Sequence, residues 1–370
     1  MTDVHITDIR SPILTTVQRE AMELAERNPV LLSASAVLAA AVEQTGLDDF
    51  GPDDFRERLE VILGALNDNT NTTALCRSGV FHRTVRLASN RLRARNLLQR
   101  HPEILELNIE RPIIVAGLPR SGTTHLLNLM AADTRLESLK YWVSLEPVPN
   151  PTERVDPDGR DCRYARAASS WEQMQKINPY MSLFHSFEPE HIHEDLELQM
   201  PDFASYVWEF AYPGTVWRDY HLCHDQTPHY EYGKTMLKIL DWQSGNKKRW
   251  VLKCPQHYEQ LPAIMKVYPD ATVVFTHRDP VSSLQSIATM VAYNARMMEK
   301  RPDPDWHFNY WAHRMETMLR NYLRDVQLVP QEQRFHSMFE KFMEDDIAQV
   351  ERIFEHAQLG NTAQSRAQLE

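Results

Sequence analysis

The sequence predicts an α/β fold in which a parallel β-sheet is flanked by helices and preceded by a helical N-terminal cap. From residue 111 onward, short β-branched runs alternate with stretches of helical composition. Strands separated by helices pair in parallel, because each helix returns the chain to the end of the sheet at which the previous strand began. Before residue 111, helical segments follow one another without a strand pattern. The chain has 370 residues and is 42% apolar, which is enough for one large core.

Residues 1–110 are expected to form the helical cap. Residues 15–28 and 30–44 have helix-forming composition, and Pro29 separates them because proline interrupts a helix. The next helix has one apolar face, formed by Phe55, Leu59, Ile62, Leu63 and Leu66. Residues 77–99 are also expected to be helical. Since no Gly/Ser-rich linker follows, we interpret the cap as packed on an α/β domain that spans residues 111–370.

Residues 111–130, which read RPIIVAGLPRSGTTHLLNLM, combine a strand, a turn and a helix. The apolar run 112–116 predicts a strand buried on both faces, and an apolar helix is expected from His125. The turn contains Gly117, Gly122, Arg120 and three hydroxyl side chains. The backbone N–H groups of such a turn and the helix N-terminus converge on an anion, and the arginine adds a full charge. The stretch therefore predicts a P-loop-like anion site.

The identity of the anion depends on one position of the loop. Gly117 and Gly122 have the spacing of a nucleotide-binding G-x-x-x-x-G frame, but Thr123 stands where the Walker lysine would be. A kinase of this fold also needs Mg²⁺ and an acidic metal ligand, which no predicted strand end supplies clearly. A sulfuryl group can be transferred without a metal when hydrogen bonds and fixed cations stabilise the leaving phosphate. An ATP-dependent small-molecule kinase and a non-catalytic nucleotide-binding protein remain the alternatives.

Further strands are predicted after the loop. They are expected at residues 249–254, 272–277 and 335–339, with helices at 259–267, 281–298 and 346–356. In parallel sheets, ligands bind at the carboxyl ends of the strands. Because Arg120, Lys253 and Arg278 all lie at such ends, we expect them to meet in space.

The segment between the loop and the second strand differs in composition. Residues 145–159 contain four prolines and are expected to be a loop. The region of about 150–245 is rich in aromatic residues, histidines and acids. We expect it to be a mostly helical insertion that forms the acceptor pocket.

Two motifs together resemble the sulfotransferases that use 3′-phosphoadenosine 5′-phosphosulfate (PAPS). Residues 119–124, PRSGTT, are similar to the 5′-phosphosulfate loop of a bacterial branch of that family. Strand 272–277 is followed by Arg278 and, eight residues later, by Ser286, which is the spacing of the family's 3′-phosphate motif. The resemblance covers roughly residues 111–359. It implies PAPS as co-substrate, 3′,5′-adenosine bisphosphate (PAP) as product, and a small-molecule or lipid hydroxyl acceptor.

The resemblance also implies roles for individual residues. Arg120 takes the position of the lysine that stabilises the departing oxygen, and Lys253 that of a lysine reaching the transferred group. The 5′-phosphate would be bound by Arg120, Ser121, Gly122, Thr123 and Thr124, and the 3′-phosphate by Arg278 and Ser286. His125 replaces a tryptophan that stacks on adenine in relatives, and Phe339 lies where an adenine-side aromatic is found.

The general base is expected among the acids and histidines of residues 185–197. On a helix, Glu190, Glu194 and Glu197 would share one face, so that one carboxylate could point into the cleft. We favour Glu194 as the catalytic base. His193 and His257 are the reserve candidates.

The overall composition argues against several classes of function. A net charge of −11 is unlike that of nucleic-acid-binding proteins. The four cysteines form no C-x-x-C pair, which is typical of a reducing compartment. The N-terminus lacks the pattern of a signal peptide, and the most apolar window, residues 29–42, is too short to span a membrane. We therefore expect a soluble, cytoplasmic protein without an integral membrane segment.

Two groups of side chains could suggest a metal. One is His191 with His193, and the other comprises His221, Cys223, His224 and His229. Residues two apart do not share a helix face and no C-x-x-C pair supports either group, so we expect no metal. The sequence leaves open whether the protein is a monomer or a homo-oligomer. The resemblance implies a basic, Gly-containing segment near the C-terminus, where Arg366 is the one basic residue after Leu359.

Overall fold

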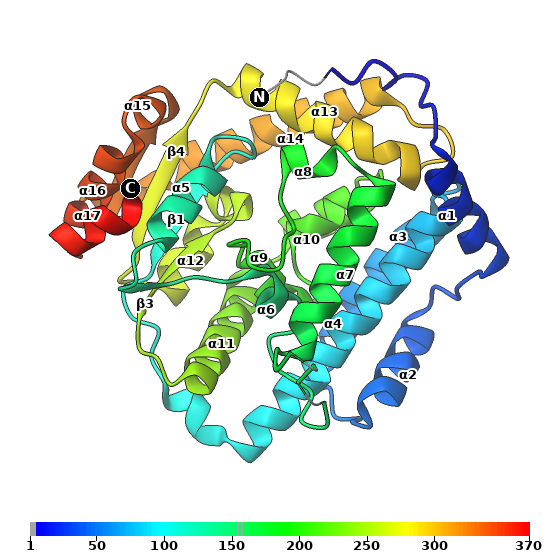
Figure 1. Ribbon diagram of the computed structural model, residues 1–370, viewed down its shortest axis with the longest axis horizontal. Helices are drawn as coiled ribbons and strands as arrows, with labels where there is room; N and C mark the ends of the chain where they lie inside the picture. The colour runs from blue at the N-terminus through cyan, green and yellow to red at the C-terminus, as the bar shows by residue number, and fades with distance from the viewer. Residues whose placement is uncertain (1–4, 154, 157) are drawn as a thin grey trace.

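The computed structural model describes residues 5–153, 155–156 and 158–370 and contains a parallel five-stranded sheet in the order β2-β3-β1-β4-β5 (Figure 1). The strands are β1 (Ile113–Gly117), β2 (Leu136–Glu137), β3 (Arg249–Lys253), β4 (Thr272–His277) and β5 (Arg334–Met338). Every pair of neighbours in this sheet is parallel, as the alternation of strands and helices predicts. The short β2 was not predicted, because two residues carry no readable pattern.

Helices cover both faces of the sheet, because successive strand residues point to opposite sides. On one face, Ile113 and Val115 of β1 belong to a core formed with α5 (Thr123–Ala131), α15 (Phe339–Glu344), α16 (Asp346–His356) and α17 (Ala363–Leu369). On the other face, Ile114 and Ala116 belong to a larger core that includes α11 (Thr227–Ser244), α12 (Leu261–Val267), α13 (Pro280–Met298) and α14 (Pro304–Asp325). The predicted α/β class is therefore confirmed.

The N-terminal region is helical, as expected. Its helices are α1 (Thr16–Arg27), α2 (Ala34–Thr45), α3 (Phe55–Asp68) and α4 (Ala74–Arg100), followed by the 3₁₀ helix η1 (Pro102–Glu106). α2 begins four residues later than predicted, because Ser33 caps it by accepting a hydrogen bond from the Ala36 amide. In Figure 1 these helices lie on the side of the molecule opposite α15–α17. Apolar residues of α3 and α4 share the larger core with β1, whereas the proposed domain boundary at residue 111 stays a prediction.

The region between β2 and β3 is less regular than predicted. It contains α6 (Tyr141–Leu145), α7 (Cys162–Ile177), α8 (Met181–Phe184), α9 (Leu196–Gln199), η2 (Met200–Asp202), η3 (Tyr206–Phe210) and α10 (Val216–Cys223), followed by α11. Residues 185–195 form no helix, which separates α8 from α9. Trp208 and Trp217 are buried in the larger core. Among the described residues, no helix is long and apolar enough to cross a membrane.

Helix α14, which the sequence did not reveal, carries a buried ion cluster. Arg314 is completely buried and donates to Glu209 of η3 at 2.8 Å and to Glu259 of η4 (Pro255–Glu259) at 2.8 Å. The Tyr310 hydroxyl donates to the same Glu209 at 2.6 Å. One guanidinium therefore joins α14 to two turns on the larger-core side of the sheet.

We predict that Arg314→Ala lowers the free energy of unfolding by about 3–5 kcal/mol, because two buried carboxylates lose their counter-charge. Urea unfolding of the purified protein measures this loss. Arg320→Ala on the same helix is the control, because its pair with Glu316 is exposed to solvent and should contribute little to stability. Equal losses of unfolding free energy in the two variants would show that the burial of Arg314 does not account for its contribution to stability.

Candidate active site

Three neighbouring strands bring Arg120, Lys253 and Arg278 to one end of the sheet. β1 pairs with β3 on one side and with β4 on the other, and paired strands lie about 4.8 Å apart. Arg120 lies in the loop after β1, Lys253 ends β3, and Arg278 follows β4. Arg278 Nη1 donates to the backbone oxygen of Arg120 at 2.7 Å, and Arg120 Nε donates to Ser286 Oγ at 3.0 Å. With Glu194, described below, these side chains are called the strand-end cluster.

The loop after β1 has the backbone of an anion cradle. Arg120 and Gly122 both have left-handed φ angles, 68° and 87°. Turns of this kind direct successive N–H groups toward one point, and Gly122 immediately precedes α5, whose N-terminus adds further N–H groups. A left-handed arginine costs free energy, and such strain is concentrated at functional sites.

Close packing against β4 holds this loop in place. A Cβ atom on Gly117 would lie 2.0 Å from Thr276 Oγ1, so that only glycine fits this position. Ser121 Oγ donates to the Leu118 carbonyl at 2.6 Å and lies 2.7 Å from Thr276 Oγ1. The hydroxyl of Ser121, which we predicted to bind phosphate, is therefore engaged in fixing the loop. Thr276 was not predicted to take part in the site, since nothing in a strand sequence marks that contact.

Arg120 lies in an electropositive environment. Burial lowers the pKa of its guanidinium, the charge of Arg278 lowers it further, and Glu194 opposes both effects. Arg120 Nη1 also donates to the Phe184 carbonyl at the end of α8. Two partly buried arginines of like charge repel each other, and a bound anion would relieve that repulsion.

Lys253 and Glu194 form a close ion pair. Lys253 Nζ lies 2.5 Å from Glu194 Oε1 and donates to Thr124 Oγ1 at 3.2 Å. The lysine side chain is 1% exposed and that of Glu194 is 14% exposed, so the pair is shielded but reachable. Lys253 thus links the threonine at the start of α5 to a carboxylate from the segment before α9. The structure brings the predicted residues Thr124, Glu194 and Lys253 together.

The expectation that Glu190, Glu194 and Glu197 share a helix face was wrong. Glu190 and Glu194 lie in a non-helical segment, and their side chains have different partners. Glu190 accepts from Trp142 Nε1 at 3.1 Å and pairs with Lys140 at 2.6 Å. Glu197 is buried, and its Oε2 atom lies 3.7 Å from Nη2 of Arg86.

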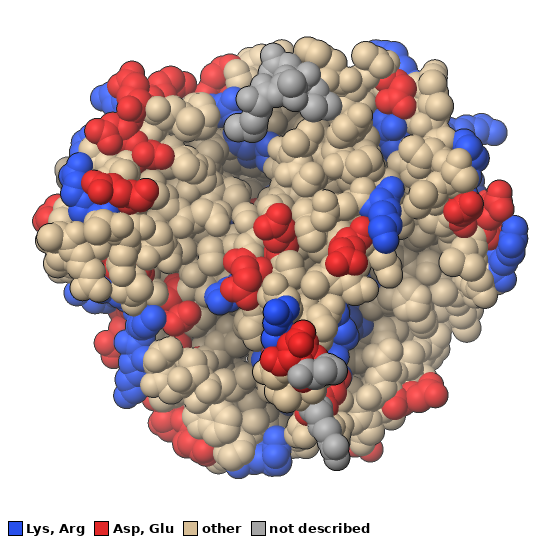
Figure 2. All heavy atoms as spheres, viewed as in Figure 1, with Lys and Arg blue, Asp and Glu red and all other residues tan. Residues whose placement is uncertain are grey.

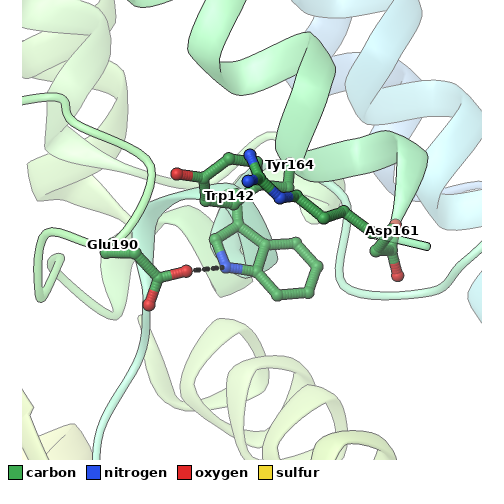
Figure 3. Close-up of a pocket in the computed structure, with 5 residues that line it drawn as sticks. Trp142, Asp161, Tyr164 and Glu190 are labelled. Atoms are coloured by element: carbon green, nitrogen blue, oxygen red, sulfur yellow. Dashed lines mark hydrogen bonds between the residues drawn. The ribbon is translucent and has the colours of Figure 1, made fainter. Parts of the chain in front are cut away.

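Glu190 instead borders a separate cavity. This cavity of about 400 Å³ is lined by Trp142, Arg160, Asp161, Tyr164 and Glu190 (Figure 3). The dashed line in Figure 3 marks the bond between Trp142 and Glu190, which fixes this carboxylate at the cavity wall. Of the three acids, Glu194 alone contacts Lys253.

The reserve histidines occupy different surroundings. His257 is 1% exposed, and both its ring nitrogens are engaged, with Tyr230 at 2.8 Å and with Asp195 at 3.0 Å. His193 is 6% exposed, packs against Tyr141, and has an unpartnered Nδ1. The geometry therefore disfavours both as bases, since neither is open to an acceptor.

His193 belongs to a group of three imidazoles that the sequence did not single out as a unit. The rings of His185, His191 and His193 lie 5.5–6.5 Å apart. Burial and the charge of Lys253 lower the pKa of His191 to about 4, and burial is also the main reason why the pKa values of His185 and His193 are well below normal. The three rings belong to the same non-helical segment as Glu194, and the charge of Lys253 acts on each of them.

The structure separates the two aromatic candidates for the adenine side. His125 Nε2 lies 2.8 Å from Asp346 Oδ2, so this ring is engaged with α16. Phe339 lies against Gly122, and the Arg278 guanidinium is stacked 4.4 Å from its ring centroid. Of the two, Phe339 is the aromatic side chain next to the strand-end cluster.

The surface over this region is hollowed. Figure 2 shows a depression between the positions of α5 and α8, with lysine and arginine atoms gathered at its edge. Across the described parts of the chain, no group of three or more His, Cys, Asp or Glu side chains is arranged to hold a metal ion. The arrangement can bind an anionic group through cations and backbone amides, next to a carboxylate able to accept a proton.

Comparison with known proteins identifies relatives of the chain. The model of the sulfotransferase family matches residues 112–362. A sulfotransferase structure from Mycobacterium tuberculosis is 25% identical with a TM-score of 0.82, over 91% of this chain and 92% of that one. A sulfotransferase structure from Mycobacterium avium is 27% identical with a TM-score of 0.82, over 92% of this chain and 87% of that one. No curated protein matches the sequence.

We predict that Gly117→Ala displaces the loop and destabilises the protein by about 1–3 kcal/mol, because the new methyl group overlaps Thr276 and overpacking costs this much. Thermal and urea unfolding measure the change. Gly79→Ala, on an exposed position of α4 with open space around it, should instead stabilise the protein by up to about 1 kcal/mol. A neutral Gly117→Ala variant would contradict the close packing of the loop on β4.

Proposed function

The chain belongs to the sulfotransferase family, and we propose that it transfers a sulfuryl group from PAPS to a hydroxyl group of a small-molecule or lipid acceptor. The observation that carries this proposal is the convergence of Arg120, Lys253 and Arg278 at the ends of β1, β3 and β4, with Glu194 on Lys253. In sulfuryl transfer, negative charge develops on the leaving group and a proton leaves the acceptor hydroxyl. Cations stabilise the first and a carboxylate can accept the second.

The residues present fit a donor that carries two separate phosphate groups. The cradle after β1, bounded by Gly117 and Gly122, would offer backbone amides to one phosphate. Arg278 follows β4 and Ser286 lies on α13, where they would hold the second. Phe339 lies under Arg278 and supplies an aromatic wall nearby. When bound, PAPS supplies the sulfuryl group and leaves as PAP.

Arg120 and Lys253 would act on the leaving side. Arg120 stays charged and can hold two oxygens at once, so it stabilises negative charge without donating its proton. Lys253 would exchange its contact with Glu194 for an oxygen of the transferred group, because the ammonium lies within reach of both the loop threonine Thr124 and Glu194. Thr123 and Thr124, at the start of α5, would add hydrogen bonds to the 5′-phosphate.

Glu194 would act on the acceptor side. The extended segment before α9 is held in place by His193 N, which donates to the Leu139 carbonyl at 2.7 Å, and by the bridge between Lys140 and Ile192. This support fixes Glu194 beside Lys253, so that an acceptor hydroxyl brought to the pair could lose its proton to the carboxylate as the new S–O bond forms.

We predict that PAP binds the protein more tightly than ATP with Mg²⁺, and that Arg278→Ala weakens PAP binding by about 10- to 100-fold, the loss expected for charge-assisted hydrogen bonds. Calorimetric titration of both nucleotides measures this. Arg301→Ala, which changes an exposed arginine outside the strand-end cluster, should leave PAP binding unchanged. Binding of ATP with Mg²⁺ alone would favour the kinase alternative.

We predict that Glu194→Gln lowers the transfer of labelled sulfate from PAPS into a metabolite and lipid extract by at least about 100-fold, since a general base contributes this much. PAP binding should persist, because the substitution keeps the size of the side chain. The matched control is Glu190→Gln, whose carboxylate belongs to the Trp142 cavity and not to Lys253. If both variants transferred sulfate like the unaltered protein, Glu194 would not be the base.

A further inference from the structure

A second cavity lies outside the strand-end cluster. It has a volume of about 290 Å³ and lies between α3, α10 and the start of α11. Its walls are formed by Asp54, Arg58, Ala204, Trp217, Tyr220, His221, His224, Asp225, Gln226, Pro228 and His229. None of the residues of the strand-end cluster lines it. The volume is at the small end of ligand cavities, about 300–1,000 Å³, which suits a ligand of one ring.

The floor of this α10 cavity contains buried polar atoms without partners. His221 and Gln226 are each 2% exposed, yet His221 Nε2 and Gln226 Oε1 have no hydrogen-bond partner. Buried polar atoms are almost always paired, because leaving one unpaired costs free energy. Two such atoms on the wall of one cavity indicate that something else satisfies them.

The unpartnered amide atom of the cavity is an acceptor. Gln226 Nε2 donates to the backbone carbonyls of His221, at 2.7 Å, and of His224, at 2.9 Å. The Oε1 atom of the same side-chain amide has no partner. His224 Nδ1 donates to the Tyr220 carbonyl at 2.7 Å, and His229 Nδ1 donates to Asp202 at 2.6 Å. The free Oε1 atom of Gln226 can only accept a hydrogen bond. The ligand should therefore be a hydrogen-bond donor.

The charged side chains at the cavity also favour a ligand that donates hydrogen bonds. Asp54 and Asp225 are exposed at its mouth, and hydrogen bonds from Thr227 are the main cause of the lowered pKa of Asp225. Arg58 also lines the cavity and pairs with Asp54 and Asp202, both at 2.8 Å, while Asp202 pairs with Arg91 as well. The lining residues thus carry two carboxylates, Asp54 and Asp225, against one guanidinium, although Lys266, outside the lining, also acts on Asp225. Burial and the charge of Arg314 lower the pKa of His221 to about 3, so this ring adds no positive charge near pH 7.

Aromatic rings complete the walls. Trp217 and Tyr220 lie with their ring centroids 5.7 Å apart in a stacked arrangement, and His221 lies 5.5 Å from Trp217. Rings of this kind attract cations through their faces. A metal ion does not fit, because the described residues contain no group of three or more His, Cys, Asp or Glu side chains with the arrangement of ligands.

We propose that the α10 cavity binds a small organic cation, a one-ring amidinium or primary ammonium compound, through Asp225, the unpartnered acceptors and the aromatic walls. The proposal is independent of the sulfuryl-transfer reaction, because it depends on a different set of residues. The ammonium or amidinium N–H groups would donate to Gln226 Oε1 and the imidazole Nε2 atoms, and the ring would pack on Trp217 and Tyr220.

The test compares benzamidine with benzamide, which has nearly the same shape but no charge, by calorimetric titration of the full chain at pH 8. We expect saturable binding of benzamidine that is at least about tenfold tighter than that of benzamide. Asp225→Asn should weaken benzamidine binding about three- to fivefold, as expected for loss of a partly exposed charge partner. This variant keeps the side-chain oxygen that caps Thr227, and its thermal midpoint should stay unchanged.

Two controls locate the site. Asp219→Asn removes an exposed carboxylate from the same helix, α10, outside the cavity, and should not change benzamidine binding. Glu194→Gln removes the carboxylate of the strand-end cluster and should not change it either. The proposal is overturned if benzamidine shows no saturable binding, if benzamide binds equally well, or if Asp225→Asn has no effect. It is also overturned if Glu194→Gln or Asp219→Asn weakens binding as much as Asp225→Asn does.

Discussion

The central position of β1 is the constraint on which the rest of the structure depends. β1 is hydrogen-bonded to β3 and to β4, so the ends of all three strands lie within two strand spacings of one another. The loop that follows β1 can pack on β4 only because Gly117 has no side chain and Ser121 reaches Thr276. Every polar residue of the strand-end cluster is positioned directly or indirectly by that arrangement.

This arrangement brings positively charged side chains close together at the ends of the strands. Arg120 has a left-handed backbone and a guanidinium whose pKa is lowered by burial and by Arg278. Glu194 compensates part of the charge through its contact with Lys253. A site of this kind costs stability in the free protein and regains it when an anion binds, which is the usual exchange between stability and function.

The helical N-terminal region forms buried ion pairs with the segment that precedes α11. Arg58 and Arg91 both contact Asp202 at 2.8 Å, and His229 contacts the same carboxylate at 2.6 Å. One buried carboxylate therefore joins α3 and α4 to the segment between Glu194 and α11. The same elements form the α10 cavity, so a ligand there would touch helices from both halves of the chain.

The sequence by itself determined the α/β class, four of the five strands and the residues of the loop, because periodicity and turn chemistry are local properties. It also predicted Arg120, Lys253 and Arg278 as neighbours, since the carboxyl ends of parallel strands share one edge. Helix α14 was missed although its apolar face is buried, and the supposed helix through Glu190 and Glu194 is a non-helical segment. Only the tertiary structure decided which acid meets Lys253, because that contact joins residues 59 positions apart. Packing between distant segments sets such pairs, and no local pattern encodes them.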